Sequence, residues 1–263
     1  MTEQVLSTNY KAPVQLLRGH NILVSGAGAG IGASAAEAFA AHGATVIMLG
    51  RTLSKLEQVH DRIVSAGHPQ PLLFELDMLS AEPGDYRELG ESVLLQLGCL
   101  HGLLNNAALL GERSPLANAG LPAWREVMEV NVTAQMLLTQ ALLPALHAAG
   151  QASVIFTSSS VGRRGRAYWG AYAVSKFATE GLMQVLAEEL ENTSEIRVNS
   201  LNPGATRSAM RAAAYPAEDP SALPTPEQLM PAYLYLMGKD SAGLHGQALS
   251  VRVEDSANSG GGQ

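Results

Sequence analysis

The amino-acid sequence predicts an α/β fold: a doubly wound parallel sheet of about seven strands, with helices on both faces, in a single domain of residues 1–263. Three observations lead to this prediction. Short β-rich runs alternate with helical stretches, a pattern that produces parallel sheets. Most of the runs are apolar nearly throughout, as in strands that are buried on both faces. No repeat or linker divides the chain, and its 46% of hydrophobic residues are enough for one large core.

The predicted strands are short runs rich in Val, Ile, Leu and Phe, and a helical stretch follows most of them. Their near-continuous apolar character places them inside the sheet rather than at a solvated face. The predicted strands are residues 21–26, 44–49, 71–76, 99–106, 152–158, 196–202 and 247–253.

The predicted helices lie between these strands. The fourth is long and contains Pro144, which we expect to kink or end the helix locally. The chain ends lie outside the alternation, and we expect residues 1–17 to form a loose N-terminal arm and residues 255–263 a flexible tail. The predicted helices are residues 32–42, 53–66, 86–97, 124–149, 171–192 and 225–237.

Composition and charge exclude several classes of partner. The net charge of −7 argues against nucleic-acid binding, which needs a concentrated basic surface. The chain starts without a basic region followed by an apolar run, and no apolar stretch is long enough to span a membrane. The single cysteine, Cys99, excludes an intrachain disulfide and fits a reducing compartment. We therefore expect a cytoplasmic protein with a small-molecule partner, no membrane or nucleic-acid contact and no metal site.

A glycine-rich turn, SGAGAGIG at residues 25–32, follows the first predicted strand and opens the first helix. Gly26, Gly30 and Gly32 follow the spacing G-x-x-x-G-x-G. A turn that is tight, approaches a pyrophosphate closely and brings helix and strand together needs glycine at such places. The helix N-terminus at Gly30 and Ile31 would offer unpaired N–H groups to the phosphates. The pattern indicates nucleotide binding; the alternative is a strand-to-helix turn that is merely tight.

The end of the second predicted strand, in MLGRTLSKL, indicates which dinucleotide binds. An acid about 20 residues after the glycine turn would bind the ribose 2′-hydroxyl of NAD, but Gly50 stands there and the next acid is Glu57. Arg51 follows, with Thr52 and Lys55 close by, and a guanidinium pairs well with a 2′-phosphate. We therefore expect NADP (NADPH) rather than NAD; the alternative is a solvated surface arginine.

Tyr172 and Lys176 lie four residues apart in AYAVSK, on a predicted helix, and therefore share one face. A tyrosine has a pKa of about 10 and is a poor base at neutral pH, but a nearby ammonium group favours the phenolate and lowers that pKa. Ser158, Ser159 and Ser160 lie about a dozen residues upstream. The combination indicates proton-transfer chemistry; for the pair alone, the alternative is a solvated helix face.

Together, these segments resemble the classical short-chain dehydrogenase/reductase family over residues 18–253, and the YciK-type bacterial oxidoreductases within it. The family's glycine turn usually begins with Thr-Gly, where this chain has Ser25-Gly26, and its Asn-Asn-Ala-Gly segment ends here in Ala108. The C-terminal Val-Asp-Gly-Gly of many members is replaced by SVRVED. The other matches are Asp77 near the adenine ring, Asn105 and Asn106 after the fourth strand, Asn131 in a helix, Ser159 at 13 residues before Tyr172, and Asn202, Pro203, Gly204 and Thr206 at the nicotinamide.

The resemblance implies a Rossmann-like fold and an oxidoreductase that interconverts a carbonyl and a secondary alcohol by hydride transfer with NADP(H). Tyr172 would act as general acid or base, and Ser159 would hold and polarise the substrate oxygen. Lys176 would lower the pKa of Tyr172 and bind the nicotinamide ribose, and Asn131 would keep a water in line with it. The alternative for each polar residue is a satisfied hydrogen bond inside the fold. The implied cofactor contacts are Gly26, Gly30, Ile31, Arg51, Asp77, Asn106, Tyr172, Lys176, Pro203, Gly204 and Thr206.

The substrate pocket is expected outside the carboxyl ends of the strands. Its expected lining is Leu109, Leu110, Val161, Trp169 and residues 205–216. Five arginines near this rim suggest a carbonyl substrate with an anionic group, steered by their field. The alternative is that they are solvated or form subunit salt bridges. These arginines are Arg163, Arg164, Arg166, Arg207 and Arg211.

Two other functions remain open. Epimerases and dehydratases of the same fold share the Tyr and Lys and retain the cofactor, but they usually need a larger substrate domain than the 60 residues that follow Pro203. A non-catalytic, redox-sensing dinucleotide-binding protein is the other. The family also implies a homodimer or homotetramer, with the helices from Trp124 and Ala171 as the expected interface.

Overall fold

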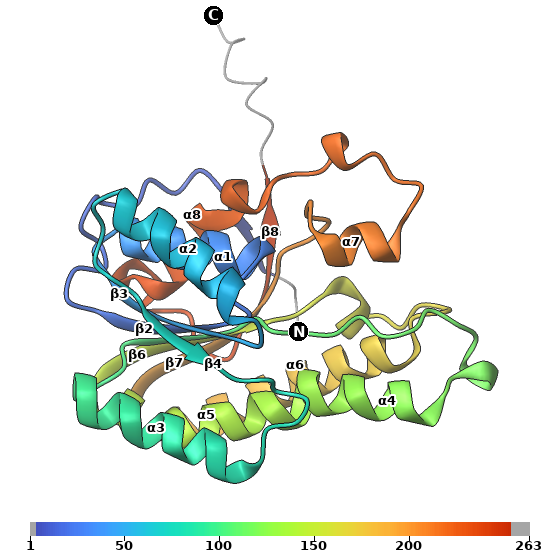
Figure 1. Ribbon diagram of the computed structural model, residues 1–263, viewed down its shortest axis with the longest axis horizontal. Helices are drawn as coiled ribbons and strands as arrows, with labels where there is room; N and C mark the ends of the chain where they lie inside the picture. The colour runs from blue at the N-terminus through green and yellow to red at the C-terminus, as the bar shows by residue number, and fades with distance from the viewer. Residues whose placement is uncertain (1–3, 254–263) are drawn as a thin grey trace, which may run out of the picture.

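The computed structural model describes residues 4–253, which form one α/β domain around a single sheet (Figure 1). The sheet has eight strands in the order β1-β8-β7-β6-β5-β2-β3-β4, and every neighbouring pair is parallel. The predicted doubly wound parallel sheet is therefore confirmed, with one strand more than expected. The strands are β1 (Gln4–Ser7), β2 (Asn21–Ser25), β3 (Thr45–Gly50), β4 (Leu72–Glu75), β5 (Gly102–Asn105), β6 (Gln151–Thr157), β7 (Glu195–Asn202) and β8 (Ala248–Arg252).

Helices cover both faces of the sheet (Figure 1). One layer contains α1, α2 and α8, and the other contains α3, α4, α5 and α6. No helix in residues 4–253 is long and apolar enough to cross a membrane. The helices are α1 (Gly30–Ala41), α2 (Leu53–Ser65), α3 (Pro83–Leu97), α4 (Leu121–Met128), α5 (Ala134–Ala148), α6 (Gly170–Leu190), α7 (Ala209–Ala214) and α8 (Pro226–Met237).

The strand order places the chain's reversal of direction at β2. From β2 the chain first adds β3 and β4 on one side, and then returns to add β5 to β8 on the other. Crossovers on opposite faces leave a crevice at the carboxyl ends of β2 and β5, where ligands of open α/β sheets bind. Two cores hold the layers together: Phe39 and Tyr233 are buried on one face of the sheet, and Tyr86, Leu138 and Met183 on the other.

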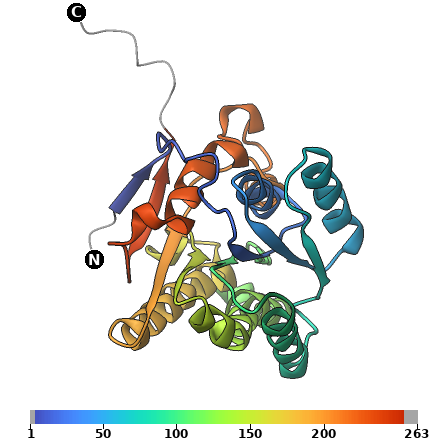
Figure 2. The same cartoon turned by 90° about the vertical axis from the view of Figure 1, so that its left-hand side faces the viewer.

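The N-terminal segment differs from the expected loose arm. Gln4–Ser7 forms strand β1, which pairs in parallel with β8 from Gln4↔Leu249 to Ser7↔Arg252. Figure 2 shows the two strands side by side at one edge of the sheet. Leu6 and Leu17 are buried, and the hydroxyl of Tyr10 donates a 2.8 Å hydrogen bond to Asp240. A four-residue strand with one buried side chain has no strong sequence pattern, which is why the alternation missed it. Residues 1–3 and the predicted tail, 255–263, lie outside the described residues.

The helix expected at residues 124–149 is divided in two. A single π-helical turn, Glu129–Thr133, separates α4 from α5. Such turns insert one residue into an α-helix and are frequent at functional sites. Pro144 does not end the helix, because α5 continues to Ala148. The interruption occurs instead around Asn131, a residue whose side chain bonds outside the helix.

Candidate active site

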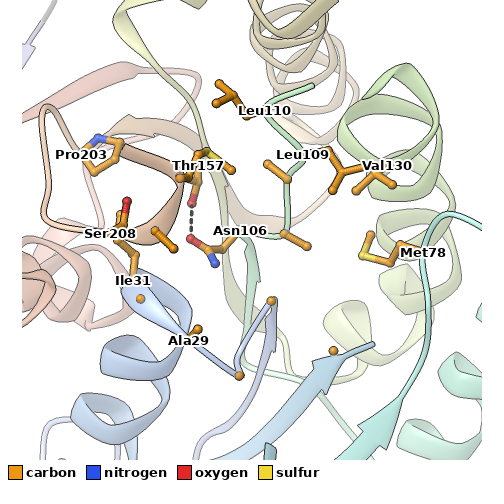
Figure 3. Close-up of a pocket in the computed structure, with 18 of the residues that line it drawn as sticks. Ala29, Ile31, Met78, Asn106, Leu109, Leu110, Val130, Thr157, Pro203 and Ser208 are labelled. Atoms are coloured by element: carbon orange, nitrogen blue, oxygen red, sulfur yellow. Dashed lines mark hydrogen bonds between the residues drawn. The ribbon is translucent and has the colours of Figure 1, made fainter. Parts of the chain in front are cut away.

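A cavity of about 570 Å³ opens at the carboxyl ends of the central strands (Figure 3). Ala29, Ile31, Pro203 and Ser208 lie at one side of it, and Met78, Leu109 and Val130 at the other. All the predicted catalytic and cofactor-binding residues line this cavity except Asn131. The expected lining omitted Met78, Val130 and Thr157. The position of Met78 directly after Asp77, and of Val130 directly before Asn131, was the only signal in the sequence for these two.

The glycine-rich turn between β2 and α1 forms a cradle that larger side chains would fill. A Cβ on Gly32 would lie 2.2 Å from the carbonyl oxygen of Gly26, and Gly26 itself has a φ of +68°. The first turn of α1 has no acidic residue, and its N-cap, Ala29, makes no side-chain cap. The unpaired N–H groups and positive dipole end of α1 therefore face the cavity, and they fit a pyrophosphate.

Ser25 ties this turn to the segment after β5. Its hydroxyl oxygen accepts hydrogen bonds from the backbone N–H groups of Asn106 (2.9 Å) and Ala107 (3.1 Å). Serine therefore supplies the hydroxyl that the family's usual threonine would supply at this position. Asn106 also donates its amide to the carbonyl oxygen of Ser25, and its Oδ1 accepts a hydrogen bond from Thr157 (Figure 3).

The end of the cavity beyond β3 carries positive charge. Arg51, Thr52 and Lys55 line it, and Gly50 at the end of β3 supplies no carboxylate. Asp77 lines the same region, and its carboxylate accepts a hydrogen bond from the backbone of Leu79. Two cations without an acid at the strand end fit a 2′-phosphate better than a ribose 2′-hydroxyl.

Tyr172 and Lys176 lie on α6 and are both buried beside the cavity. The ammonium group of Lys176 lies 5.7 Å from the ring centre of Tyr172 and donates a 2.7 Å hydrogen bond to the carbonyl oxygen of Thr157. Ser159 interacts with the hydroxyl of Tyr172 and lowers its pKa. The sequence pattern thus brings a phenol, an ammonium and a hydroxyl together, as a proton-transfer site requires.

Burial sets the protonation of this pair. It raises the pKa of Tyr172 to about 12, and the hydrogen bond to Ser159 only partly opposes it. It lowers the pKa of Lys176 to about 8, against the attraction of Glu180. We expected Lys176 to lower the pKa of Tyr172, but loss of hydration on burial raises it instead. At neutral pH both groups therefore carry their protons, and Tyr172 is poised as an acid.

Among the three serines, Ser159 alone pairs with Tyr172. Ser158 is buried and donates its hydroxyl hydrogen to Glu180, and Ser160 is exposed. Glu180 also accepts hydrogen bonds from Ser200 (2.6 Å) and from Arg163 (3.2 Å). This buried acid, one turn after Lys176, was missed in the sequence, although its place on the same helix face was a signal.

The side chain of Asn131 is fully engaged with a loop and with α6. Its Oδ1 accepts a hydrogen bond from the N–H of Leu109 (2.7 Å), and its amide donates to the carbonyl oxygen of Leu109 and to Ser175. It therefore fixes the loop that lines the cavity.

The segment after β7 closes the end of the cavity where the family resemblance places the nicotinamide. Gly204 has a φ of +75°, and its N–H donates a 3.0 Å hydrogen bond to the side chain of Asn202. Thr206 is buried and bonds back to the carbonyl oxygens of Pro203 and Gly204. The turn exposes backbone groups to the cavity, as a contact with a carboxamide requires.

Four of the five rim arginines have protein partners. Arg163 bonds to Glu180, Ser250 and the carbonyl of Leu249, and Arg207 bonds to three carbonyl oxygens of residues 220–223. Arg211 forms a salt bridge with Glu218, and Arg166 donates to the hydroxyl of Tyr215. These contacts favour the structural alternative over steering of an anion. Val161 does not line the cavity but packs behind Trp169 and Tyr172.

Comparison with known proteins agrees with this geometry. A profile described as short chain dehydrogenase matches residues 20–219. This chain belongs to the short-chain dehydrogenase family. It is 50% identical to the oxidoreductase YciK of Escherichia coli K12 over 233 residues. The matched region covers 89% of this chain and 92% of YciK. The predicted resemblance to YciK-type oxidoreductases is therefore confirmed.

Two solved structures resemble this short-chain dehydrogenase closely. A short chain dehydrogenase from Pseudomonas syringae is 57% identical, with a TM-score of 0.91, over 92% of this chain and 98% of that one. A short chain dehydrogenase from Shigella flexneri 2a, complexed with NADP, is 49% identical, with a TM-score of 0.88, over 90% of this chain and 99% of that one. Among residues 4–253, no group of three or more His, Cys, Asp or Glu side chains could hold a metal ion.

Proposed function

We propose that this short-chain dehydrogenase interconverts a carbonyl compound and a secondary alcohol by hydride transfer with NADP(H). The observation that carries the proposal is that one cavity joins the glycine cradle of α1 to Tyr172, Lys176 and Ser159. When bound, the nicotinamide supplies or accepts the hydride. The protein's part is to bind the cofactor, orient the carbonyl and move the proton.

Tyr172 is the proton donor for carbonyl reduction. Its pKa of about 12 keeps it protonated at neutral pH, so it delivers its proton to the oxygen that gains negative charge. Ser159 donates a hydrogen bond to the same oxygen. In alcohol oxidation Tyr172 must first lose its proton, and a bound, positively charged oxidised nicotinamide would lower the pKa of Tyr172.

The cofactor is NADP(H). Arg51 and Lys55 hold the 2′-phosphate, and the N–H groups at the start of α1 hold the pyrophosphate. The NADP in the related Shigella protein supports this assignment. Asp77 and Asn106 line the adenosine side, and Lys176, Gly204 and Thr206 line the nicotinamide side.

One cavity is lined by Tyr172, Lys176 and Ser159 together, and this supports catalysis rather than a purely redox-sensing role. We propose a cytoplasmic homo-oligomer. Val174, Phe177 and Val185 leave an exposed apolar surface on α6, which supports an interface there.

The test begins with a fluorescence titration of the purified protein with NADPH and with NADH, followed by an NADPH-dependent assay on ketones and aldehydes. We expect tighter binding of NADPH, and turnover that falls about 10²- to 10⁴-fold in Tyr172→Phe. The matched control is Tyr168→Phe, which changes an exposed tyrosine four residues away. Binding of neither cofactor contradicts the proposal. An intact cellular role in Tyr172→Phe would favour redox sensing.

A further inference from the structure

The substrate end of the cavity has an apolar, aromatic wall. Trp169, Tyr172 and Ala214 form a buried cluster with Val161 and Ala173. Leu110, Met210 and Tyr215 pack against it. Trp169, Leu110, Met210 and Ala214 also line the cavity, next to the hydroxyl groups that would bind the carbonyl oxygen. A substrate that places its carbonyl at Tyr172 therefore brings its remaining atoms against hydrocarbon.

Three arginines at this end already have protein partners. Arg211 lines the cavity near Trp169, and two of its nitrogens each lie 2.6 Å from the carboxylate of Glu218. Arg166 donates a hydrogen bond to the hydroxyl of Tyr215, and Arg113 donates one to the carbonyl oxygen of Ala214. An anionic substrate would have to displace one of these partners or remain unpaired against hydrocarbon, and both cost free energy.

Trp169 is held in place from several directions. Its ring lies 5.7 Å from that of Tyr172 and 5.9 Å from that of Tyr215, and the guanidinium of Arg113 lies 4.7 Å from its centre. Arg113 also lies against the ring of Tyr215 and bonds to the carbonyl oxygen of Ala214 in α7. Three segments, carrying Arg113, Trp169 and Tyr215, are thereby tied together.

The backbone next to Trp169 is unusual. Tyr168 is the one non-glycine residue in the described part of the chain with a positive φ, at 70°. A bulky residue in this conformation is strained, and it persists where the surroundings enforce it. The conformation turns the chain so that Tyr168 is exposed while Trp169 is buried against the cavity.

We propose that this site reduces uncharged, predominantly hydrophobic ketones, and that Trp169 is the residue that selects them. The inference rests on the proposed function. The reaction balances as ketone, NADPH and a proton giving secondary alcohol and NADP⁺: a hydride adds to the carbonyl carbon and Tyr172 protonates the oxygen. Trp169 contacts the hydrocarbon part of the substrate, and Tyr215 is a positioning residue that fixes Trp169.

The chain offers a direct reporter for this contact. It contains two tryptophans, so Trp124→Phe leaves Trp169 as the only indole. In this variant, saturated with NADP⁺, a ketone binds without being reduced, and quenching of Trp169 measures its Kd. The probes are 4-methylcyclohexanone and 4-oxocyclohexanecarboxylate, which differ in the charge of one substituent.

We expect 4-methylcyclohexanone to quench Trp169 with a Kd about tenfold or more below that of the carboxylate. Equal or tighter binding of the carboxylate overturns the inference, and so does a fluorescence that neither ketone changes. Failure of the Trp124→Phe variant to bind NADP⁺, when wild type also fails, contradicts the proposed function instead.

Substitution of Trp169 gives an independent test by turnover. Trp169→Ala should lower kcat/KM for 4-methylcyclohexanone about tenfold or more, mainly through KM, with Trp169→Phe intermediate. NADPH affinity should stay unchanged, which shows that the fold is intact. Tyr215→Ala should raise KM in the same way, and Tyr215→Phe should restore it, because the ring and not the hydroxyl lies against Trp169. A Trp169→Ala enzyme with unchanged KM overturns the inference.

Discussion

The ammonium group of Lys176 donates a 2.7 Å hydrogen bond to the carbonyl oxygen of Thr157, the last residue of β6. This contact joins α6 to the carboxyl end of the sheet, at the point where the cavity begins. Lys176 is almost completely buried, so its charge is held by this carbonyl and by the attraction of Glu180. The same lysine therefore bears on catalysis and on the pH dependence of stability.

The contribution of Lys176 to the stability of the protein without cofactor should rise between pH 8 and pH 10. Burial lowers the pKa of Lys176 from 10.5 to about 8, so in this window its side chain holds more protons in the unfolded state than in the folded one. Stability increases with pH wherever the unfolded state binds more protons. Chemical denaturation at several pH values measures the slope, and Lys176→Met should flatten it. An identical slope in wild type and variant would show that Lys176 is not the group responsible.

Removal of the Arg51 side chain should shift cofactor preference. Arg51 lines the cavity beyond β3, so Arg51→Ala should weaken NADPH binding about tenfold or more and leave NADH binding unchanged. Arg87→Ala, which removes an exposed arginine of α3 outside the cavity, is the matched control. Parallel loss of both cofactors in Arg51→Ala would contradict a 2′-phosphate contact.

A methyl group at Gly32 should disturb the phosphate cradle. Its Cβ would lie 2.2 Å from the carbonyl oxygen of Gly26, so Gly32→Ala must shift the turn at a cost of about 1–3 kcal/mol in stability. We expect NADPH affinity to fall about tenfold or more. Gly181→Ala is the control, because no heavy atom lies within 4 Å of its added Cβ. Normal NADPH binding by Gly32→Ala would contradict the proposed pyrophosphate site.

The buried pair of Glu180 and Arg163 should matter more to stability than an exposed pair. Glu180→Gln leaves Arg163 without its carboxylate partner and should cost about 3 kcal/mol in the free energy of unfolding. Addition of Arg163→Met should recover part of this loss. Glu37→Gln, which breaks the exposed pair with Arg62, should change stability by about 1 kcal/mol or less. Equal effects of the two glutamate substitutions would contradict the importance of burial.

The alternation of apolar runs and helical stretches predicted the layered sheet because a buried parallel sheet imposes that pattern on the sequence. This alternation did not predict three features of the fold. Strand β1 is short and mostly exposed, α7 has only six residues, and the π-turn at Asn131 has no periodicity of its own. Each depends on contacts with distant segments, such as β8 for β1 and Leu109 for Asn131.

The candidate site was more predictable in its residues than in its electrostatics. Glycine spacing and the Tyr172–Lys176 interval lie within single elements, so the sequence alone places them. The pKa values depend on burial, which three-dimensional packing decides, and burial reverses the shift expected for Tyr172. The rim arginines lie close in sequence to residues of the pocket, so the sequence placed them near its rim. Their partners, such as Glu218 and Leu249, could be identified only from the fold.

The pairing of β1 with β8 also has a consequence for how the protein is made. Gln4 leaves the ribosome long before its partner Leu249 is synthesised. This edge of the sheet therefore cannot close until β8 has emerged, and β1 stays unpaired until then. Trimming β1 would leave β8 as a bare edge open to pairing with other chains.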